Sequence, residues 1–235
     1  MGSMIDQPRD PSTTPRAVFF DIDGTLVDSN YAHVDAWVKA FRDVGHPVDA
    51  WRIHRSIGKD ASLLVEGLLG EELAGQLTDR VKDAHTTHYA DHLGEGTDLR
   101  VFEGATDLLS ELSRRGHQVV LATSAPEEEL AFLRDLLDVE GALWAVTSSE
   151  DVATAKPDPG IVEVALQRAG VAPDRAVMVG DATWDVEAAA RAGVASVGVL
   201  TGGFSRDELT QAGAESVYDD VASLLDGLDD SLLGR

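Results

Sequence analysis

Two aspartates, Asp21 and Asp23, stand one residue apart at the end of the apolar run Ala17–Phe20, and Gly24 follows them directly. Asp and Gly are common turn residues, so a strand that leads into a loop would account for one acid beside a glycine. The segment D-I-D-G-T-L-V-D, however, holds three acids in eight positions. Because like charges this close cost free energy unless a cation lies among them, the crowding indicates a cation-dependent site.

Polar side chains also follow the next three apolar runs of the chain. These residues are Thr123 and Ser124 after Gln118–Ala122, Lys156 after Leu143–Val146, and Asp181 and Asp185 after Ala176–Val179. The hydroxyls and the last two acids could serve only as helix caps or first-turn acids. Lys156 is harder to explain in that way, because the helix dipole disfavours a cation at a helix start, and a bound anion would account for it better.

Together these residue types favour phosphoryl transfer. Clustered carboxylates in a chain without cysteine favour a hard divalent cation, and Mg²⁺ suits one or two acids combined with waters and a substrate phosphate. A carboxylate can attack phosphorus to form an aspartyl-phosphate, and a second Asp two residues further on can protonate the leaving alkoxide and then deprotonate a water. Lys156, the hydroxyls and the backbone N–H groups of the loop at Gly24 are donors that stabilise the transferring charge.

The apolar runs alternate with amphipathic segments, which predicts an α/β fold. Strands are expected at the four runs above and at Ser196–Val199, with helices that begin near Ala105, Glu127, Asp158 and Thr183. This alternation predicts a Rossmann-like parallel sheet with helices on both faces. Since ligands of such sheets bind beyond the carboxyl ends of the strands, the polar side chains above are expected to converge there.

Between the first strand and the rest lies a segment with helical periodicity and no convincing strand. Helices are expected at Asn30–Val44, Asp49–Ile57, Ala61–Leu69 and Glu71–His92. We therefore expect a disordered lead-in at 1–15, a catalytic core at 16–29 and 99–228, an inserted helical cap at 30–98 and a tail at 229–235.

Composition narrows the possible partners. The chain has 235 residues, no cysteine and a formal net charge of -23, which argues against binding to nucleic acid or to an anionic membrane. No apolar run reaches the ~18 residues of a membrane span, and the absence of cysteine excludes disulfides, thiolate nucleophiles and Cys-ligated zinc. We expect a cytoplasmic monomer or small homo-oligomer whose partner is a small-molecule phosphomonoester.

The four motifs resemble those of the haloacid dehalogenase superfamily, in the order of that family. They are D-I-D-G-T-L-V-D-S, Thr123 after an apolar strand, K-P-D-P around Lys156, and G-D-A-T-W-D. Each motif is weak alone, but the ordered set is specific and spans Asp21 to Asp185. The helical segment resembles the α-helical cap that this family inserts after its first strand.

The resemblance implies a role for each motif residue. Asp21 is the nucleophile, Asp23 the general acid and base, and Thr123 a phosphate ligand, with Ser124, Gly24 and Thr25 beside the phosphate. Lys156 stabilises the nucleophile and the phosphoryl group. Mg²⁺ is held by Asp21, the Asp23 backbone carbonyl and Asp181, with Asp185 as a secondary partner.

Three alternatives remain open beside a phosphatase. Family members that remove halide from 2-haloacids lack the second aspartate, so the presence of Asp23 argues against that reaction. A beta-phosphoglucomutase-like mutase carries a His where this chain has His33, and Lys59 could reach the distal end of a substrate. A binding module that lost turnover is disfavoured because Asp21 and Asp23 are intact.

A histidine face on the last predicted cap helix is not assigned as a site. His85, His88 and His92 occupy positions i, i+3 and i+7 of the segment A-H-T-T-H-Y-A-D-H. Three such side chains could bind a transition metal. The sequence places no carboxylate clearly as a fourth ligand and no strand end beside them, so a polar cap face is the preferred interpretation.

Overall fold

The computed structural model describes residues 17–94, 97–151 and 156–234, and within them the chain forms a six-stranded, all-parallel sheet. Its order is β3-β2-β1-β4-β5-β6. The strands are β1 (Ala17–Phe20), β2 (Gln118–Leu121), β3 (Leu143–Val146), β4 (Ala176–Gly180), β5 (Ala195–Val199) and β6 (Ser216–Tyr218). The first strand therefore lies in the middle of the sheet, where it pairs with β2 on one side and β4 on the other.

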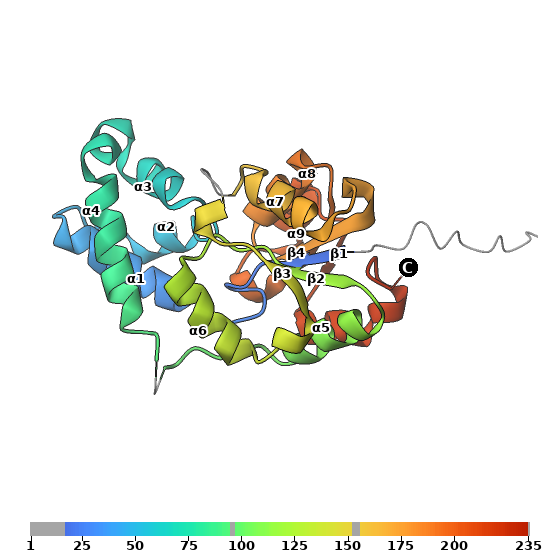
Figure 1. The fold of residues 1–235 in the computed structure, drawn as a ribbon. Helices are drawn as coiled ribbons and strands as arrows, with labels where there is room; N and C mark the ends of the chain where they lie inside the picture. The colour runs from blue at the N-terminus through green and yellow to red at the C-terminus, as the bar shows by residue number, and fades with distance from the viewer. Residues whose placement is uncertain (1–16, 95–96, 152–155, 235) are drawn as a thin grey trace, which may run out of the picture.

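Helices cover both faces of the sheet (Figure 1). The helices that follow β1 in the core are α5 (Ala105–Arg114), α6 (Glu127–Leu137), α7 (Gly160–Ala169), α8 (Thr183–Arg191), α9 (Arg206–Ala212) and α10 (Val221–Asp226). Alternation along β1 assigns the faces: Val18 and Phe20 pack in the cluster that contains α5, α6 and α10, while Ala17 and Phe19 pack with α7 and α8. All four β1 side chains are fully buried, as expected for a central parallel strand.

A helical module with its own apolar core follows β1. Its helices are α1 (Asn30–Asp43), α2 (Ala50–His54), α3 (Ala61–Leu69) and α4 (Glu71–Ala90). Trp37 and Phe41 of α1 pack against Val65 of α3 and Val81 of α4 in a separate hydrophobic cluster. In Figure 1 this module lies to one side of the sheet and its flanking helices.

The structure confirms the predicted α/β class and the five predicted strands, of which two match at both ends and three differ by one residue at one end. It adds β6, α9 and α10, which the sequence analysis did not predict. Each of these three elements has seven residues or fewer, and β6 is only partly buried, so none gives a long periodic pattern. The predicted start of α7 near Asp158 moves to Gly160, because Pro159 precedes the helix and the Asp158 carboxylate accepts from the Gly160 N–H.

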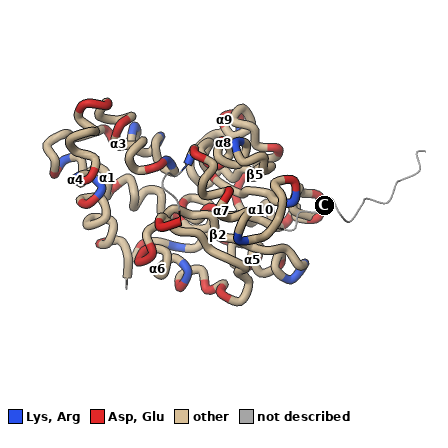
Figure 2. Tube along the Cα trace, turned by 45° about the horizontal axis from the view of Figure 1, so that its top comes forward, with Lys and Arg blue, Asp and Glu red and all other residues tan. Residues whose placement is uncertain are grey.

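The lead-in predicted at 1–15 lies outside the described residues. Within the described residues no helix is both long and apolar enough to cross a membrane. Figure 2 shows Asp and Glu distributed over the helical module and the core alike, with Lys and Arg scattered among them. The excess of negative charge is therefore not confined to one part of the molecule.

Two leucines that differ in burial, one on α5 and one on α3, should differ in their contribution to stability. Leu112 is 0% exposed, whereas Leu63 on α3 is 44% exposed. Leu112→Ala should lower the free energy of unfolding in urea by about 2–5 kcal/mol, because it removes core contacts and leaves a cavity. The matched Leu63→Ala should change it by less than about 0.5 kcal/mol. Equal losses for the two variants would contradict this assignment of the core.

Candidate active site

The polar residues predicted to converge do meet at the carboxyl ends of the central strands. Asp21 follows β1, Thr123 follows β2, and Asp181 follows β4 directly. The Asp21 backbone N–H donates to the Val179 carbonyl at 3.0 Å, which continues the β1–β4 pairing into the site. Because the three strands are adjacent and parallel, their carboxyl ends lie side by side and bring these side chains together.

Three buried carboxylates lie close together at this edge, and a lysine contacts two of them. Asp21, Asp181 and Asp185 offer oxygens that all lie within 4.8 Å of one another. Lys156, only 3% exposed, places its Nζ 2.5 Å from Asp21 Oδ1 and 2.6 Å from Asp185 Oδ1. The other Asp185 oxygen accepts from the Ala182 N–H at 3.0 Å. Asp185 is therefore engaged through both oxygens.

Asp181 is fixed by neighbours from two distant parts of the chain. Its Oδ1 accepts from the Thr25 hydroxyl at 2.8 Å, and its Oδ2 accepts from the Asn30 amide at 3.2 Å. Glycines let the backbone approach it: a Cβ added at Gly202 would lie 1.7 Å from Asp181 Oδ2, and one at Gly24 would lie 2.5 Å from it. Gly24 also has φ +74°, a left-handed conformation that glycine adopts without steric cost.

The electrostatics of the cluster fit a bound cation. Burial raises the pKa of Asp21 to about 7, against the attraction of Lys156, and Asp185 and Asp23 raise it further. Burial, and then Asp185 and Asp21, raise the pKa of Asp181 well above its usual value. Burial alone would lower the pKa of Lys156, but the two carboxylates raise it. The three carboxyl groups offer only oxygen atoms as ligands, and their mutual repulsion opposes the ionisation of all three. A hard divalent cation would bind such oxygens and stabilise the ionised forms.

Asp23 lies in a different environment from Asp21. Its Oδ1 accepts from the Ser29 hydroxyl and lies 3.4 Å from His33 Nε2. Burial would raise the pKa of Asp23, but the charge and hydrogen bond of His33, helped by Ser29, lower it below its ordinary value. The two aspartates of the first motif are therefore separated in acidity by their surroundings.

A cavity of about 460 Å³ opens in front of the two aspartates. The site residues predicted from the sequence that line it are Asp21, Asp23, His33, Lys59, Thr123, Ser124 and Lys156. Residues of the helical module form much of the opposite wall, among them Trp37, Leu64 and Tyr89. The Nζ of Lys59 lies over the Trp184 ring, 4.0 Å from its centre, on the rim of this cavity.

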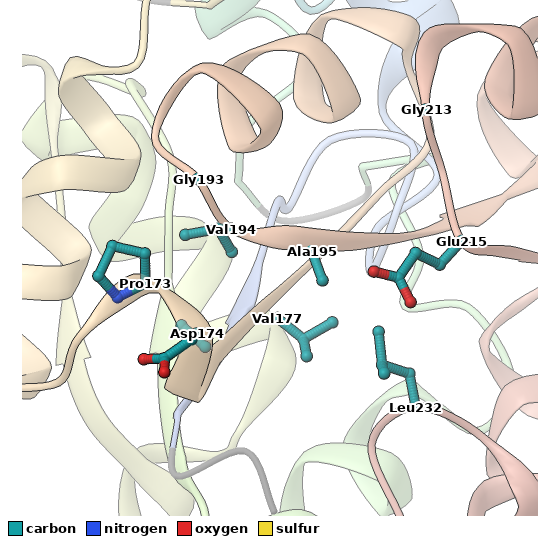
Figure 3. A pocket seen from close by; sticks show the side chains of 10 residues that line it. Pro173, Asp174, Val177, Gly193, Val194, Ala195, Gly213, Glu215 and Leu232 are labelled. Atoms are coloured by element: carbon teal, nitrogen blue, oxygen red, sulfur yellow. The ribbon is translucent and has the colours of Figure 1, made fainter. Parts of the chain in front are cut away.

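A second cavity, of about 500 Å³, lies at the opposite edge of the sheet. Figure 3 shows Asp174 and Glu215 on either side of Val177 and Ala195, near the beginnings of β4 and β5. Among the residues that the structure describes, its lining combines two acids with small and apolar side chains and contains no lysine, histidine or hydroxyl. The residues that could do chemistry are therefore grouped at the carboxyl edge, around the first cavity.

The predicted histidine face does not form a single site. His88 Nε2 lies 2.7 Å from Asp43, His92 Nε2 lies 2.9 Å from Asp35, and His85 Nε2 faces His33 Nδ1 at 3.3 Å. Each of the three rings thus contacts a different partner on α1. His85 and His88 stand on α4, whereas His92 lies two residues beyond its end at Ala90, so the predicted helix to His92 is shorter in the structure.

Three residues of the site were not singled out by the sequence analysis. Asn30 holds Asp181, Thr201 donates to the Gly24 carbonyl, and Glu129 lies 3.6 Å from His33. Asn30 follows the first motif at the start of a helix, where it looks like a cap. Glu129 looks like an ordinary first-turn acid of α6, and only the fold brings it to the cavity.

Comparison with known proteins gives a consistent result. A model of the haloacid dehalogenase-like hydrolases matches residues 15–193. A phosphoglycolate phosphatase of Rhodospirillum rubrum is 36% identical over 220 residues, which cover 91% of either protein. The crystal structure of a hydrolase from Pseudomonas syringae is 33% identical, with a TM-score of 0.84 over 91% of this chain and 98% of that one. A beta-phosphoglucomutase candidate from Bacteroides vulgatus shares the fold at 21% identity, with a TM-score of 0.83 over 95% and 92% of the two chains.

The raised pKa of Asp21 predicts a pH-dependent stability difference. With its folded pKa raised to about 7, the group favours folding fully below its unfolded pKa of about 3.9, and this contribution is lost as pH rises to the folded value. In EDTA, Asp21→Asn should therefore be more stable than the unchanged chain at pH 8, and by less at pH 5. Urea unfolding at several pH values measures this difference.

Asp207 provides the matched control, since it is an exposed aspartate on α9. Asp207→Asn should differ from the unchanged chain by the same small amount at every pH. A pH-independent difference for Asp21→Asn as well would mean that Asp21 ionises normally in the fold.

Proposed function

The chain belongs to the haloacid dehalogenase-like hydrolases, and on that basis we propose that it is a Mg²⁺-dependent phosphatase that cleaves a small phosphomonoester through an aspartyl-phosphate at Asp21. One observation carries the proposal. The Asp21 carboxylate lies against Lys156 at the base of a cavity that Asp23, Thr123 and Ser124 also line. The proposed nucleophile, the proton carrier and the groups that would donate hydrogen bonds to the phosphate thus line one cavity.

In the first step, an Asp21 oxygen attacks phosphorus while the bond from phosphorus to the leaving oxygen breaks. Asp23 gives its proton to that oxygen, so the product leaves as an alcohol. Lys156 and the Thr123 and Ser124 hydroxyls carry donors toward the phosphoryl oxygens, where negative charge spreads in the transition state. The cavity walls from the helical module limit the access of bulk water during this step.

In the second step, a water attacks the phosphorus of the aspartyl-phosphate and releases inorganic phosphate and the Asp21 carboxylate. Asp23 accepts the proton of that water. The lowered pKa of Asp23 suits the state that follows the first step, when Asp23 has given up its proton. His33 and Ser29 stabilise that ionised form against the opposing effect of burial. At the end of the cycle Asp21 is again a free carboxylate and Asp23 again carries a proton.

The metal would be held by Asp21, the Asp23 backbone carbonyl and Asp181. Asp185 fits a secondary place, because one of its oxygens is paired with the charged Lys156, whereas the donors to Asp181 are the neutral Thr25 hydroxyl and Asn30 amide. Mg²⁺, when bound, supplies positive charge that offsets both the carboxylates and the transferring phosphoryl group. Gly202 and Gly24 keep the backbone close enough for Asp181 to hold its orientation.

A small phosphorylated metabolite is the proposed substrate class, and 2-phosphoglycolate is the first candidate because the Rhodospirillum rubrum relative is a phosphoglycolate phosphatase. The second candidate function is a phosphosugar mutase. It is favoured by His33 beside Asp23, at the position where such mutases carry a histidine. A mutase would pass the phosphoryl group to another hydroxyl of the sugar rather than to water.

Phosphate release from a panel of phosphomonoesters tests the function. The panel contains 2-phosphoglycolate, glucose 1-phosphate and glucose 6-phosphate, each with Mg²⁺ and with EDTA. We expect Mg²⁺-dependent release, and a loss of about 10³-fold or more in Asp21→Asn, because the amide is a poor nucleophile. Conversion of glucose 1-phosphate to the 6-phosphate that requires a bisphosphate, without phosphate release, would replace the phosphatase by the mutase.

Asp181 should control the metal requirement. Asp181→Asn removes one anionic oxygen donor, so the Mg²⁺ concentration for half-maximal activity should rise about tenfold or more. The exposed aspartate control, Asp207→Asn, should leave the titration unchanged. An unaltered Mg²⁺ titration of Asp181→Asn would remove this residue from the proposed ligands.

A further inference from the structure

Glu129 is a buried acid at the cavity for which the proposed mechanism has no use. It belongs to the first turn of α6, together with Glu127 and Glu128, yet it is 9% exposed while those two are exposed. Its neighbours Leu130 and Leu133 pack into the main core. A carboxylate in such a place destabilises the fold unless a partner offsets its burial.

The partner that the structure provides is His33. Glu129 Oε1 lies 3.6 Å from His33 Nε2, and the same nitrogen lies 3.4 Å from Asp23 Oδ1. The imidazole thus lies between the proposed proton carrier and the α6 carboxylate. Two carboxylates that share one ring nitrogen confine its position more strongly than either could alone.

The remaining sides of the ring are also occupied. His33 stacks on Tyr89, with ring centres 3.9 Å apart and planes 5° apart, and its Nδ1 faces His85 Nε2 at 3.3 Å. His85 in turn stacks on Trp37 at 4.0 Å. The histidine is therefore held by the module helices α1 and α4, and Glu129 is its contact with the core helix α6.

We propose that Glu129 is a positioning residue that acts through His33 to keep the Asp23 carboxylate in place for proton transfer to the leaving group. Glu129 itself touches neither substrate nor metal in this account. The inference rests on the proposed function, because it takes Asp23 as the acid that protonates the leaving oxygen. Removing Glu129 frees one side of the His33 ring, so that His33 is held less firmly beside Asp23, whose other contact is the Ser29 hydroxyl.

Dependence on the leaving group distinguishes this role from a structural one. An alkyl phosphate releases a poor leaving group whose oxygen needs a proton as the bond breaks, whereas p-nitrophenyl phosphate releases a stable phenolate that does not. Loss of proton transfer to the leaving oxygen therefore slows the first step selectively for the alkyl substrate. The second step, in which Asp23 is the base, is common to both substrates, so the comparison uses kcat/KM, which reports the first step. A general distortion of the site would slow both substrates by the same factor.

The experiment compares kcat/KM for the best alkyl phosphate of the panel and for p-nitrophenyl phosphate in full-length Glu129→Leu. We expect kcat/KM to fall about tenfold or more for the alkyl phosphate, within the range of general acid catalysis, and about twofold or less for p-nitrophenyl phosphate. Glu127→Leu, in the same helical turn but exposed, should leave both rates unchanged. Glu129→Gln keeps an acceptor oxygen and should recover part of the lost rate.

A double-mutant cycle tests whether Glu129 acts through His33. His33→Gln should show the same selective loss, and the double variant Glu129→Leu/His33→Gln should lose little more than His33→Gln alone, because both changes break one chain of contacts. Losses that multiply would show that Glu129 acts independently and would overturn the proposal. So would an equal loss for the two substrates, or no loss at all.

Thermal unfolding controls for the fold of each variant. If Glu129→Leu does not fold, Glu129→Gln takes its place in the same comparison, with the same selective loss expected at a smaller size. Failure of the proposed function is a separate result, because the unchanged protein would then release no phosphate from any substrate. If the unchanged protein is active but its Glu129 variants show no selective loss for the alkyl phosphate, only the positioning role is contradicted.

Discussion

The ion pairs of Lys156 with Asp21 and Asp185 are the interaction on which the rest of the site depends. Three buried carboxylates within one small space repel each other and lose hydration, and this lysine offsets part of that cost. The part of the cost that the lysine does not offset raises the pKa values of Asp21 and Asp181. Burial is the largest cause of both shifts, and the neighbouring acids add to it. This charge balance supports the proposed binding of a cation and of the anionic phosphoryl group.

The topology of the sheet makes this concentration of charge possible. β1 lies between β2 and β4, so the residues that follow these strands meet at one edge although they are far apart in the sequence. The chain enters the helical module immediately after the first motif, and residues of that module line the same cavity. Asp21 therefore faces the core residues, while Asp23 faces His33 of the module.

Much of this arrangement follows from the sequence, and the exceptions have physical reasons. Strand-end residues such as Thr123 and Asp181 were predictable, because apolar runs mark strands and parallel strands align their carboxyl ends. The short elements β6, α9 and α10 bury too few residues to leave a pattern. Asn30 and Glu129 look like helix-start residues in sequence, and their contacts with Asp181 and His33 depend on distances that only the folded chain sets.

The central claim is that the phosphoryl group passes through Asp21, and trapping that intermediate tests it most directly. The protein is mixed with an excess of its best substrate and Mg²⁺, quenched in acid during the first turnovers, digested and analysed by mass spectrometry. The account predicts one added phosphoryl group on the peptide that contains Asp21, present during turnover and absent once substrate is exhausted. Rapid phosphate release with that peptide unmodified at every time, or with the phosphoryl group on another residue, would contradict it.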